Sequence, residues 1–444
     1  MTELSEKPTQ VETIGIEYVP PEKRHGSAGR TFTLWFAANL TIADYVIGVL
    51  VTVFFGMTFV QAIPILIVGN VLGGLLVGLS AAMGPKLGFP QMFSSGASFG
   101  RKGNYPLGLA NWISTVGWFA VNTILGTLAI QALDSSINYY AAATLLVVVQ
   151  VLIGIFGHDF IHLFEKVMSI VLGILFLVVF ILAIPELGKV IVASGSGGIF
   201  SFTLGAAGTT LASSFSYIMS WSPYASDYSR YLPESTSKTR IAIYTLIGGA
   251  VASFAVEALG ALVGAITNSG DYFGALRTFS GNIGYIVLVG LILGALAANS
   301  LNIYTNSLSA LVLDVKTKRW ITVVIGGVIG LALTIIGGVN FEANFENFLL
   351  VLDYWITPWL AIILVDFYLA KKTTMLTAER ARSWDLGALG IYGLSILISV
   401  PFMSWPTGYI FPLSSKFFQG ADFSYFISFI AAAILIYAYR RWRS

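Results

Sequence analysis

Amide and indole side chains recur at helical spacing in two apolar stretches of the sequence. Asn299, Asn302 and Asn306 follow the spacing i, i+3, i+7 and therefore lie on one face of a helix. Trp118 and Asn122 share a face in the same way, because they are one helical turn apart. An amide offers donors and an acceptor, and an indole offers a flat ring. The combination is typical of a site for a flat heterocycle with polar edges, whereas Trp118 alone would also fit core packing or contact with lipid.

Two other stretches carry polar or helix-weakening residues near the middle of an apolar segment. Residues 38–44 include Asn39 and Asp44, and residues 213–223 are rich in serine and end at Pro223. An unsatisfied polar group inside a membrane is costly, so these stretches must face protein or a water-filled cavity. Packing between small residues is the alternative explanation, but it accounts for neither the acid nor the proline. We expect both helices to be interrupted there.

Membrane helices are the elements that must position these residues. The chain has 444 residues, of which 56% are hydrophobic and 10% charged, against roughly 25% charged residues in soluble domains. This composition excludes an ordinary soluble fold and indicates an all-α integral membrane protein. Hydropathy and helix breakers predict twelve transmembrane helices, at 31–55, 59–83, 105–133, 139–157, 163–184, 207–231, 240–267, 283–313, 319–338, 345–370, 386–403 and 421–439.

The basic residues test this set of spans independently, because cytoplasmic loops are enriched in Lys and Arg. Of the 24 basic residues, 21 fall on one side of the predicted bundle, and three, Lys189, Arg277 and Lys416, fall on the other. One missed or invented helix would scramble this division. We therefore expect a multi-pass protein of the plasma membrane with both termini in the cytoplasm.

The two interrupted spans are the first and the sixth, which occupy corresponding positions in two halves of five helices. Such a pair indicates a transporter built as an inverted repeat, whose broken helices present carbonyls and helix ends to substrate and ion. The expected organisation is a cytoplasmic segment at 1–30, a first repeat at 31–190, a second repeat at 206–372 and two peripheral helices at 384–440.

Four motifs follow one another along the chain. They are LWFAANLTIADYVIG at 34–48, VGWFAVN at 116–122, SWSPYASDYSRYLP at 220–233 and ANSLNIYTNSLS at 298–309. Together they resemble the nucleobase:cation symporter family, nearest its purine-cytosine permease branch. The resemblance covers nearly the whole chain. It implies a LeuT-like fold of five plus five helices with two extra helices, importing a purine or cytosine with a cation by alternating access, and no enzyme activity.

The resemblance also implies roles for single residues. In the family a tryptophan of helix three stacks on the ring and an amide one turn later bonds its edge, which matches Trp118 and Asn122. An asparagine of helix eight matches Asn302. The helix-six aromatic is Trp221 or Tyr217, and we favour Trp221. The expected substrate-binding residues are Trp118, Asn122, Trp221, Tyr217, Ser220, Asn299, Asn302, Ala43 and Asp44.

The coupling ion follows from a departure from the family pattern. Sodium-coupled members hold the ion between helix-one carbonyls and hydroxyl groups of helix eight, but here Ala297 and Ala298 precede Asn299. A methyl group offers no oxygen to a hard cation. This favours a proton over sodium, and a proton needs a buried titratable group. The candidates for the coupling site are Asp44, Glu257 and Asn39, with Asp353 as a further acid. For each acid a neutral structural role is the alternative.

Other classes of protein account for less of the sequence. The segment His158-Asp159-Phe160-Ile161-His162 approximates the HExxH zinc motif of metalloproteases, but an aspartate stands where the glutamate belongs. No third ligand is evident, since the remaining histidine, His25, lies in the amino-terminal segment. A transporter of hydantoin-, allantoin- or uracil-like rings, or a sodium-coupled transporter of amino acids, would share the architecture. We expect a monomer surrounded by lipid, with no metal, no cofactor besides the coupling cation and no nucleic-acid partner.

Overall fold

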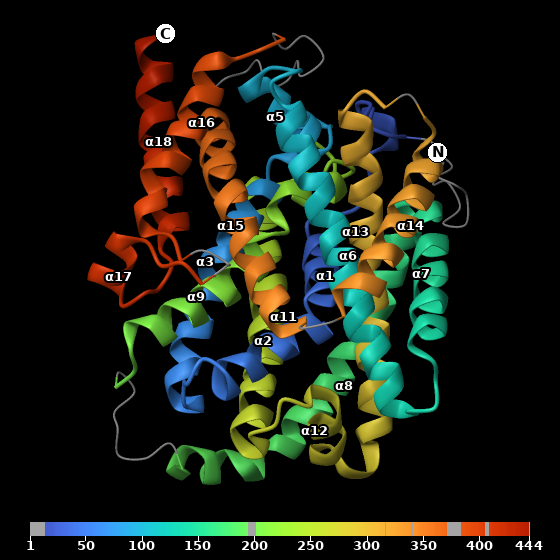
Figure 1. Ribbon diagram of the computed structural model, residues 1–444. Coiled ribbons are helices and arrows are strands. Elements are labelled where there is room, and N and C mark those ends of the chain that lie inside the picture. The colour runs from blue at the N-terminus through green and yellow to red at the C-terminus, as the bar shows by residue number, and fades with distance from the viewer. Residues whose placement is uncertain are drawn as a thin grey trace.

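The computed structural model describes residues 14–193, 201–315, 317–338, 341–370, 383–404 and 408–443. Within these ranges the chain folds into a bundle of helices (Figure 1). The longer helices are α1 (Gly29–Ala38), α2 (Ile42–Val53), α3 (Phe59–Ala81), α6 (Tyr105–Leu133), α7 (Tyr139–Phe156), α8 (His158–Ala193), α9 (Leu204–Met219), α11 (Lys238–Thr267), α13 (Gly284–Val312), α14 (Arg319–Gly337), α15 (Phe341–Leu364), α16 (Leu386–Ser399) and α18 (Ser424–Trp442). The shorter ones are α4 (Gly84–Leu87), α5 (Gln91–Phe99), α10 (Ala225–Ser229), α12 (Tyr272–Phe279) and α17 (Pro412–Phe418).

Fewer helices are long and apolar enough to cross a membrane than the sequence predicts. Among the described residues, eight helices are long and apolar enough to cross a membrane, and the bent pair α1 and α2 makes a ninth. The chain is thus an all-helical, multi-span membrane protein. The other three predicted spans coincide with α9, which has 16 residues, α16, which has 14, and α18, which ends in Arg440 and Arg441. That these three cross the bilayer stays a prediction.

Helix borders follow the sequence in most of the bundle, and α6 occupies the predicted range 105–133. The fifth predicted span, 163–184, is wrong at both ends, because α8 begins at His158 and extends beyond Pro185. Proline is tolerated inside a membrane helix when neighbouring helices satisfy the freed backbone groups. Glu165, near the start of α8, is fully buried.

Both predicted interruptions are present. The axes of α1 and α2 are bent by 56°. The hydroxyl of Thr41 accepts a hydrogen bond from the backbone N–H of Asp44 and so caps the start of α2. α9 gives way to a 3₁₀ turn, Ser222–Tyr224, before α10 begins. Backbone groups at such breaks lie outside the regular hydrogen-bond pattern and can serve a ligand.

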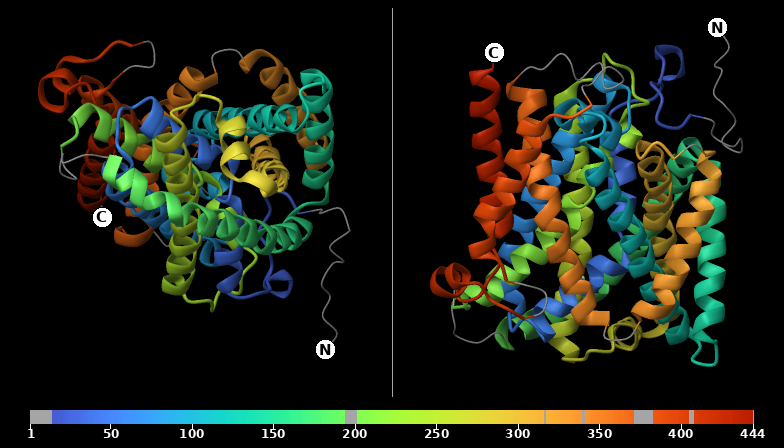
Figure 2. Two further views of the ribbon diagram at one scale, coloured as in Figure 1. Left: turned by 90° about the horizontal axis from the view of Figure 1, so that it is seen from below. Right: turned by 45° about the horizontal axis from the view of Figure 1, so that its top comes forward.

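The broken helices pack against unbroken ones at close range. α2 contacts α6, α9 and α11, and α9 contacts α3 and α15. A Cβ atom added to Gly48 would lie 1.9 Å from the carbonyl oxygen of Glu257, and one added to Gly260 would lie 2.0 Å from that of Tyr45. The backbones of α2 and α11 therefore touch, as small residues allow in membrane helices. α16 and α18 pack on each other at one edge of the bundle (Figures 1 and 2).

A buried ion pair fastens this edge to the rest of the bundle. Arg440 of α18 donates to both carboxylate oxygens of Asp366 at 2.9 Å and to Asp385 at 2.7 Å. Asp366 is fully buried in the π-helical turn Val365–Leu369 that follows α15. Removing the cation would leave a buried carboxylate with fewer partners.

We expect Arg440→Met to lower the free energy of unfolding by roughly 3–5 kcal/mol, the usual cost of breaking a buried ion pair. Differential scanning fluorimetry in detergent would show this as a lower Tm. Arg443→Met is the control, because Arg443 is exposed one turn further along the chain. Equal Tm values for the two variants would contradict the role given to Arg440.

Candidate functional site

The two helix breaks meet inside the bundle. The hydroxyl groups of Thr41 and Tyr217 are 2.7 Å apart, which joins the α1–α2 break to the last turn of α9. On the α1 side, the indole N–H of Trp221 donates to the side-chain oxygen of Asn39 at 3.1 Å. All four side chains are buried. The breaks therefore form one polar centre, linked by side chains from both.

The amides predicted on α6 and α13 form a network beside this centre. The side-chain oxygen of Asn299 accepts hydrogen bonds from Asn122 at 3.2 Å and from Asn302 at 3.1 Å. The Asn299 amide nitrogen donates to the backbone oxygen of Phe119 at 2.9 Å. Asn302 accepts from the hydroxyl of Tyr224, at 3.2 Å. Asn299 thus has partners on both ends of its amide and holds the other two amides in place.

Asn306 does not join the described network. Its amide nitrogen donates to the backbone oxygen of Trp112 at 3.1 Å and to the hydroxyl of Thr115 at 3.0 Å. Those residues lie on α6 before Trp118. The shared helix face is therefore correct for all three asparagines, but the contacts divide them into a pair near Asn122 and a third residue further along.

Trp118 lies in a cluster of aromatic rings. Its ring is 5.3 Å from that of Tyr217, 5.2 Å from Phe348 and 6.1 Å from Phe345, each at a steep angle. The indole N–H of Trp118 and the side-chain oxygen of Asn122 are both buried and have no hydrogen-bond partner among the described residues. One face of α6 thus carries a donor and an acceptor that the protein itself leaves unused.

The helix-six residues separate into two environments. Tyr217 contacts Trp118, whereas the ring of Trp221 lies 5.5 Å from Trp35 and 5.3 Å from Tyr224. The hydroxyl of Ser220 donates to the backbone oxygen of Tyr217 at 2.6 Å and so serves the end of α9. The geometry favours Tyr217 as the aromatic residue next to Trp118, although the sequence favoured Trp221. Ala43, also expected at the site, is buried in the first turn of α2.

Two of the predicted acids lie close together, Asp44 on α2 and Glu257 on the adjacent helix α11. Asp44 accepts a hydrogen bond from Ser253 at 2.6 Å and one from Thr41 at 3.4 Å. One turn further along α11, a single oxygen of Glu257 accepts from Asn70 at 2.5 Å and from Ser214 at 2.9 Å. Both carboxyl groups are fully buried, and they are close enough to interact electrostatically. Asp353 on α15 is buried elsewhere, where it interacts with Asp422.

A further buried acid, Glu165 on α8, is absent from the residues expected from the sequence. It accepts a hydrogen bond from Ser300 of α13 at 3.1 Å, and its second oxygen has no partner among the described residues. Glu165 was not expected at the site because the predicted fifth span begins at 163. Together with the neighbouring exposed residue Lys166, this acid therefore looked like part of the boundary of the span. The signal that could have found it is the apolar run on both sides.

The region between the α1–α2 break and α13 is closely packed. A Cβ atom added to Gly294 of α13 would lie 2.6 Å from the carbonyl oxygen of Leu40, in the α1–α2 break. Ala297 and Ala298, one turn on, are buried and carry no side-chain oxygen. The nearest hydroxyl along α13, that of Ser300, donates to the Ala297 carbonyl and to a carboxyl group. The side chains of Ala297 and Ala298 therefore offer no oxygen to a hard cation.

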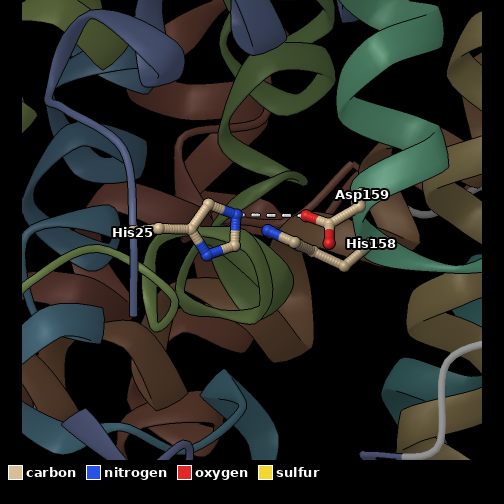
Figure 3. A group of neighbouring side chains, drawn as sticks. All are labelled: His25, His158 and Asp159. Atoms are coloured by element: carbon tan, nitrogen blue, oxygen red, sulfur yellow. Dashed lines mark hydrogen bonds and ion pairs between the residues drawn. The ribbon is translucent and has the colours of Figure 1, made fainter. Parts of the chain in front are cut away.

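The expectation that the His158–His162 motif lacks a third ligand is wrong. His25 comes within 3.2 Å of Asp159, and the imidazole of His158 lies beside them (Figure 3). The hydrogen bond to Asp159 raises the pKa of His25. Proximity in the fold, across 134 residues of sequence, brings the amino-terminal segment to the start of α8.

Two interrupted helices that meet at a buried polar centre, inside a multi-span bundle, define a membrane transporter. Residues 18–428 match the family described as permeases for cytosine/purines, uracil, thiamine and allantoin, and the chain belongs to that family. It is therefore a permease and not an enzyme, which excludes the metalloprotease alternative. The family resemblance carried by the four motifs is confirmed.

Individual relatives agree with this assignment. The chain is 32% identical to YxlA of Bacillus subtilis (strain 168), provisionally named a purine-cytosine permease, over 96% of this chain and 95% of that protein. It is 28% identical to the purine-cytosine permease fcyB of Emericella nidulans, over 82% of this chain and 74% of that protein. Mhp1, a nucleobase-cation-symport-1 transporter solved in a closed conformation with bromovinylhydantoin, has the same fold, with a TM-score of 0.78 at 17% identity over 98% and 95% of the two chains.

Proposed function

We propose that this permease imports a nucleobase, a purine or cytosine, together with a cation, and that the cation is a proton. The observation that carries the substrate class is the unused indole donor of Trp118 and the unused amide acceptor of Asn122, buried on one face of α6 beside the helix breaks. Relatives named as purine-cytosine permeases support the same class.

The unused pair has the polarity of a nucleobase edge. Cytosine and adenine each present a ring-nitrogen acceptor next to an exocyclic amino donor. The Trp118 N–H can donate to the ring nitrogen, and the Asn122 oxygen can accept from the amino group. Asn299 positions Asn122 by accepting from its amide nitrogen, and Asn302 extends the network. Tyr217 is the aromatic residue of helix six that we place against the substrate. We place Trp221, Ser220 and Ala43 further from the substrate than Tyr217.

The coupling site that we propose adjoins the substrate site. Asp44 bonds Thr41, Thr41 bonds Tyr217, and the ring of Tyr217 contacts Trp118. A change in the charge of Asp44 therefore reaches the substrate through two hydrogen bonds and one ring contact. Glu257 interacts with Asp44 across α11 and can exchange the proton with it. Asn39, whose amide bonds Trp35 and Trp221, holds the break in shape.

The arrangement of helices supports the five-plus-five inverted repeat, with twelve membrane crossings in all. The breaks of helices one and six meet, as equivalent parts of two repeats would, and α16 and α18 stand at the edge. We assign 31–190 and 206–372 to the repeats and 384–440 to the peripheral pair. The first described residues of the chain and the end of α18 lie on one side of the bundle (Figure 1). This agrees with cytoplasmic termini in the plasma membrane and a cytoplasmic segment at 1–30.

Of the basic residues assigned to the cytoplasmic side, Lys7, Lys316, Lys371, Lys372, Arg380 and Arg382 lie outside the described residues. The orientation therefore rests on the remaining ones and is a proposal, as is the monomeric state. Accessibility of single cysteines introduced at Lys102 and Lys189 to an impermeant reagent would test the orientation, because the chain has no native cysteine.

Uptake into proteoliposomes tests substrate and coupling together. We expect saturable uptake of labelled cytosine or a purine, accelerated by an inward proton gradient and unchanged when sodium is replaced by potassium. A gradient of one pH unit supplies about 1.4 kcal/mol and should give about tenfold accumulation. Uptake that follows a sodium gradient alone would exclude proton coupling, and saturable uptake of no nucleobase would exclude the substrate class.

A second candidate substrate comes from the description of the family, which includes uracil and allantoin. These rings, like hydantoins, carry alternating carbonyl acceptors and N–H donors, so they too can pair with the Trp118 donor and the Asn122 acceptor. Competition of unlabelled rings against labelled cytosine separates the two candidates. Stronger competition by allantoin or uracil than by adenine would assign the permease to them.

A further inference from the structure

Three potential metal ligands converge where the amino-terminal segment, residues 14–28, meets the start of α8. One ligand atom each from His25, His158 and Asp159 lie within 4.8 Å of one another. Figure 3 shows the imidazole of His25 bonded to the carboxylate and a nitrogen of His158 beside that bond. The side chains of His25 and Asp159 are 35% and 30% exposed, and His158 is buried. The group is therefore buried on the side of His158 and open to solvent on the side of His25 and Asp159.

The chemistry of this set suits a divalent transition metal. Two imidazoles and one carboxylate are a common ligand set for Zn²⁺, with water as the fourth ligand. Ligands about 2.0–2.1 Å from a tetrahedral ion lie about 3.4 Å apart. The Nε2 atom of His25 and the Oδ1 atom of Asp159 are 3.2 Å apart already, so that edge needs almost no movement. Closing the third side onto His158 needs a shift of at most about 1.4 Å, within the reach of side-chain rotation.

A small cavity adjoins the three ligands. It measures about 10 Å³ and is lined by His25, His158, His162, Arg30 and Tyr231, among others. That is room for about one water molecule, which is what the open position of such a site holds. His162 lies 4.4 Å from His158 between ring centres but does not belong to the group of three converging ligands. The charge of Arg30 opposes a cation here, but its side chain is exposed and screened by solvent.

The amino-terminal segment reaches α8 from contacts with other cytoplasmic elements. Its Val19 N–H donates to the Gly88 oxygen at 2.9 Å, and the His25 N–H donates to the Tyr231 oxygen at 2.7 Å. Arg230, after α10, donates to the Gly15 oxygen at 2.9 Å. The segment thus contacts both the turn after α4 and the residues that follow α10. A metal at His25 would add a bond from this segment to α8.

We propose that His25, His158 and Asp159 form a binding site for a divalent transition metal of the zinc class, which fastens the amino-terminal segment to α8 at the cytoplasmic end of the permease. The site is separate from the substrate centre and does not depend on which ring is transported. It uses the zinc-like motif of the sequence as a structural ligand set, with no hydrolytic step.

Isothermal titration calorimetry of the full chain, purified without a histidine tag, tests the site with ZnCl₂. We expect one Zn²⁺ per chain for the native sequence. His25→Gln keeps a donor toward Asp159 but removes the metal ligand, so it should weaken binding by more than about 100-fold, beyond the roughly 10–100-fold of a second-shell loss. Asp159→Asn should weaken it similarly. No zinc binding by the native chain, or binding that these two variants leave unchanged, would overturn the site.

Glu22→Gln is the matched control, because Glu22 is an exposed acid on the same segment and should leave zinc affinity unchanged. Equal Tm values without zinc would show that the variants fold alike. Hydrogen–deuterium exchange then tests the fastening. Zinc should slow exchange of backbone amides in residues 14–28 of the native chain and not in His25→Gln. Unchanged exchange in the native chain with zinc bound would refute the fastening of the segment.

Discussion

Trp118→Ala is expected to abolish measurable nucleobase binding. The variant removes both the unused indole N–H and the ring that Tyr217, Phe345 and Phe348 surround. It also removes a side chain that is 96% buried, so a stability cost of roughly 3–5 kcal/mol accompanies the loss. Binding of a radiolabelled base to purified protein, measured beside the Tm, would separate the two effects. Affinity equal to that of the native chain would remove Trp118 from the site.

Trp118→Phe makes the same prediction sharper, because it keeps an aromatic ring and deletes the N–H. Losing one hydrogen bond to a buried polar group costs roughly 1–3 kcal/mol, which is about 5- to 150-fold in affinity. Trp359→Phe is the matched control. Trp359 of α15 is also fully buried with an indole N–H lacking a partner among the described residues, but it packs near Trp355 and not at the helix breaks. Equal losses in both variants would mean that the indole acts only through packing.

The faces of the unbroken helices could be predicted from the sequence because helical periodicity fixes them. Asn122 on α6 meets Asn299 on α13, and Asn302 bonds Asn299 on the same face of α13, as their spacing requires. Periodicity is a weaker guide at helix six. Past the end of α9 the chain turns through a 3₁₀ segment, so a residue one turn beyond Tyr217 no longer shares its face. The choice between the two aromatics depended on that change of direction, which no periodic pattern contains.

Two other features depended on tertiary structure that the sequence does not encode locally. Glu165 is buried through its contact with α13, and the helix that carries it, α8, begins at His158, one and a half turns earlier than hydropathy predicts. His25 approaches Asp159 because the amino-terminal segment is held by backbone hydrogen bonds to distant loops. Composition in both places indicated only a cytoplasmic boundary, since charged and polar residues there are normally solvated.

The arrangement of Asp44 and Glu257 now allows the coupling hypothesis to be tested with little structural disturbance. An asparagine at 44 can still accept from Ser253 with its oxygen and donate to Thr41 with its nitrogen, in the geometry of the present contacts. A glutamine at 257 can likewise accept from Ser214 with its oxygen. Each amide mimics the protonated acid, so it removes the titration while keeping the shape and the hydrogen bonds of the loaded state.

Asp44→Asn or Glu257→Gln is therefore expected to abolish accumulation driven by a proton gradient and to spare exchange of labelled for unlabelled base. A carrier locked in its protonated form can cross with substrate in both directions but cannot draw energy from the gradient. In proteoliposomes with a gradient of one pH unit, the accumulation ratio should fall from about ten to about one. Asp353→Asn controls for the loss of any buried acid, because Asp353 lies outside this network. If both variants concentrate substrate as the native chain does, neither acid carries the proton, and Glu165, a further buried carboxyl bonded to α13, is the residue to test by the same pair of assays.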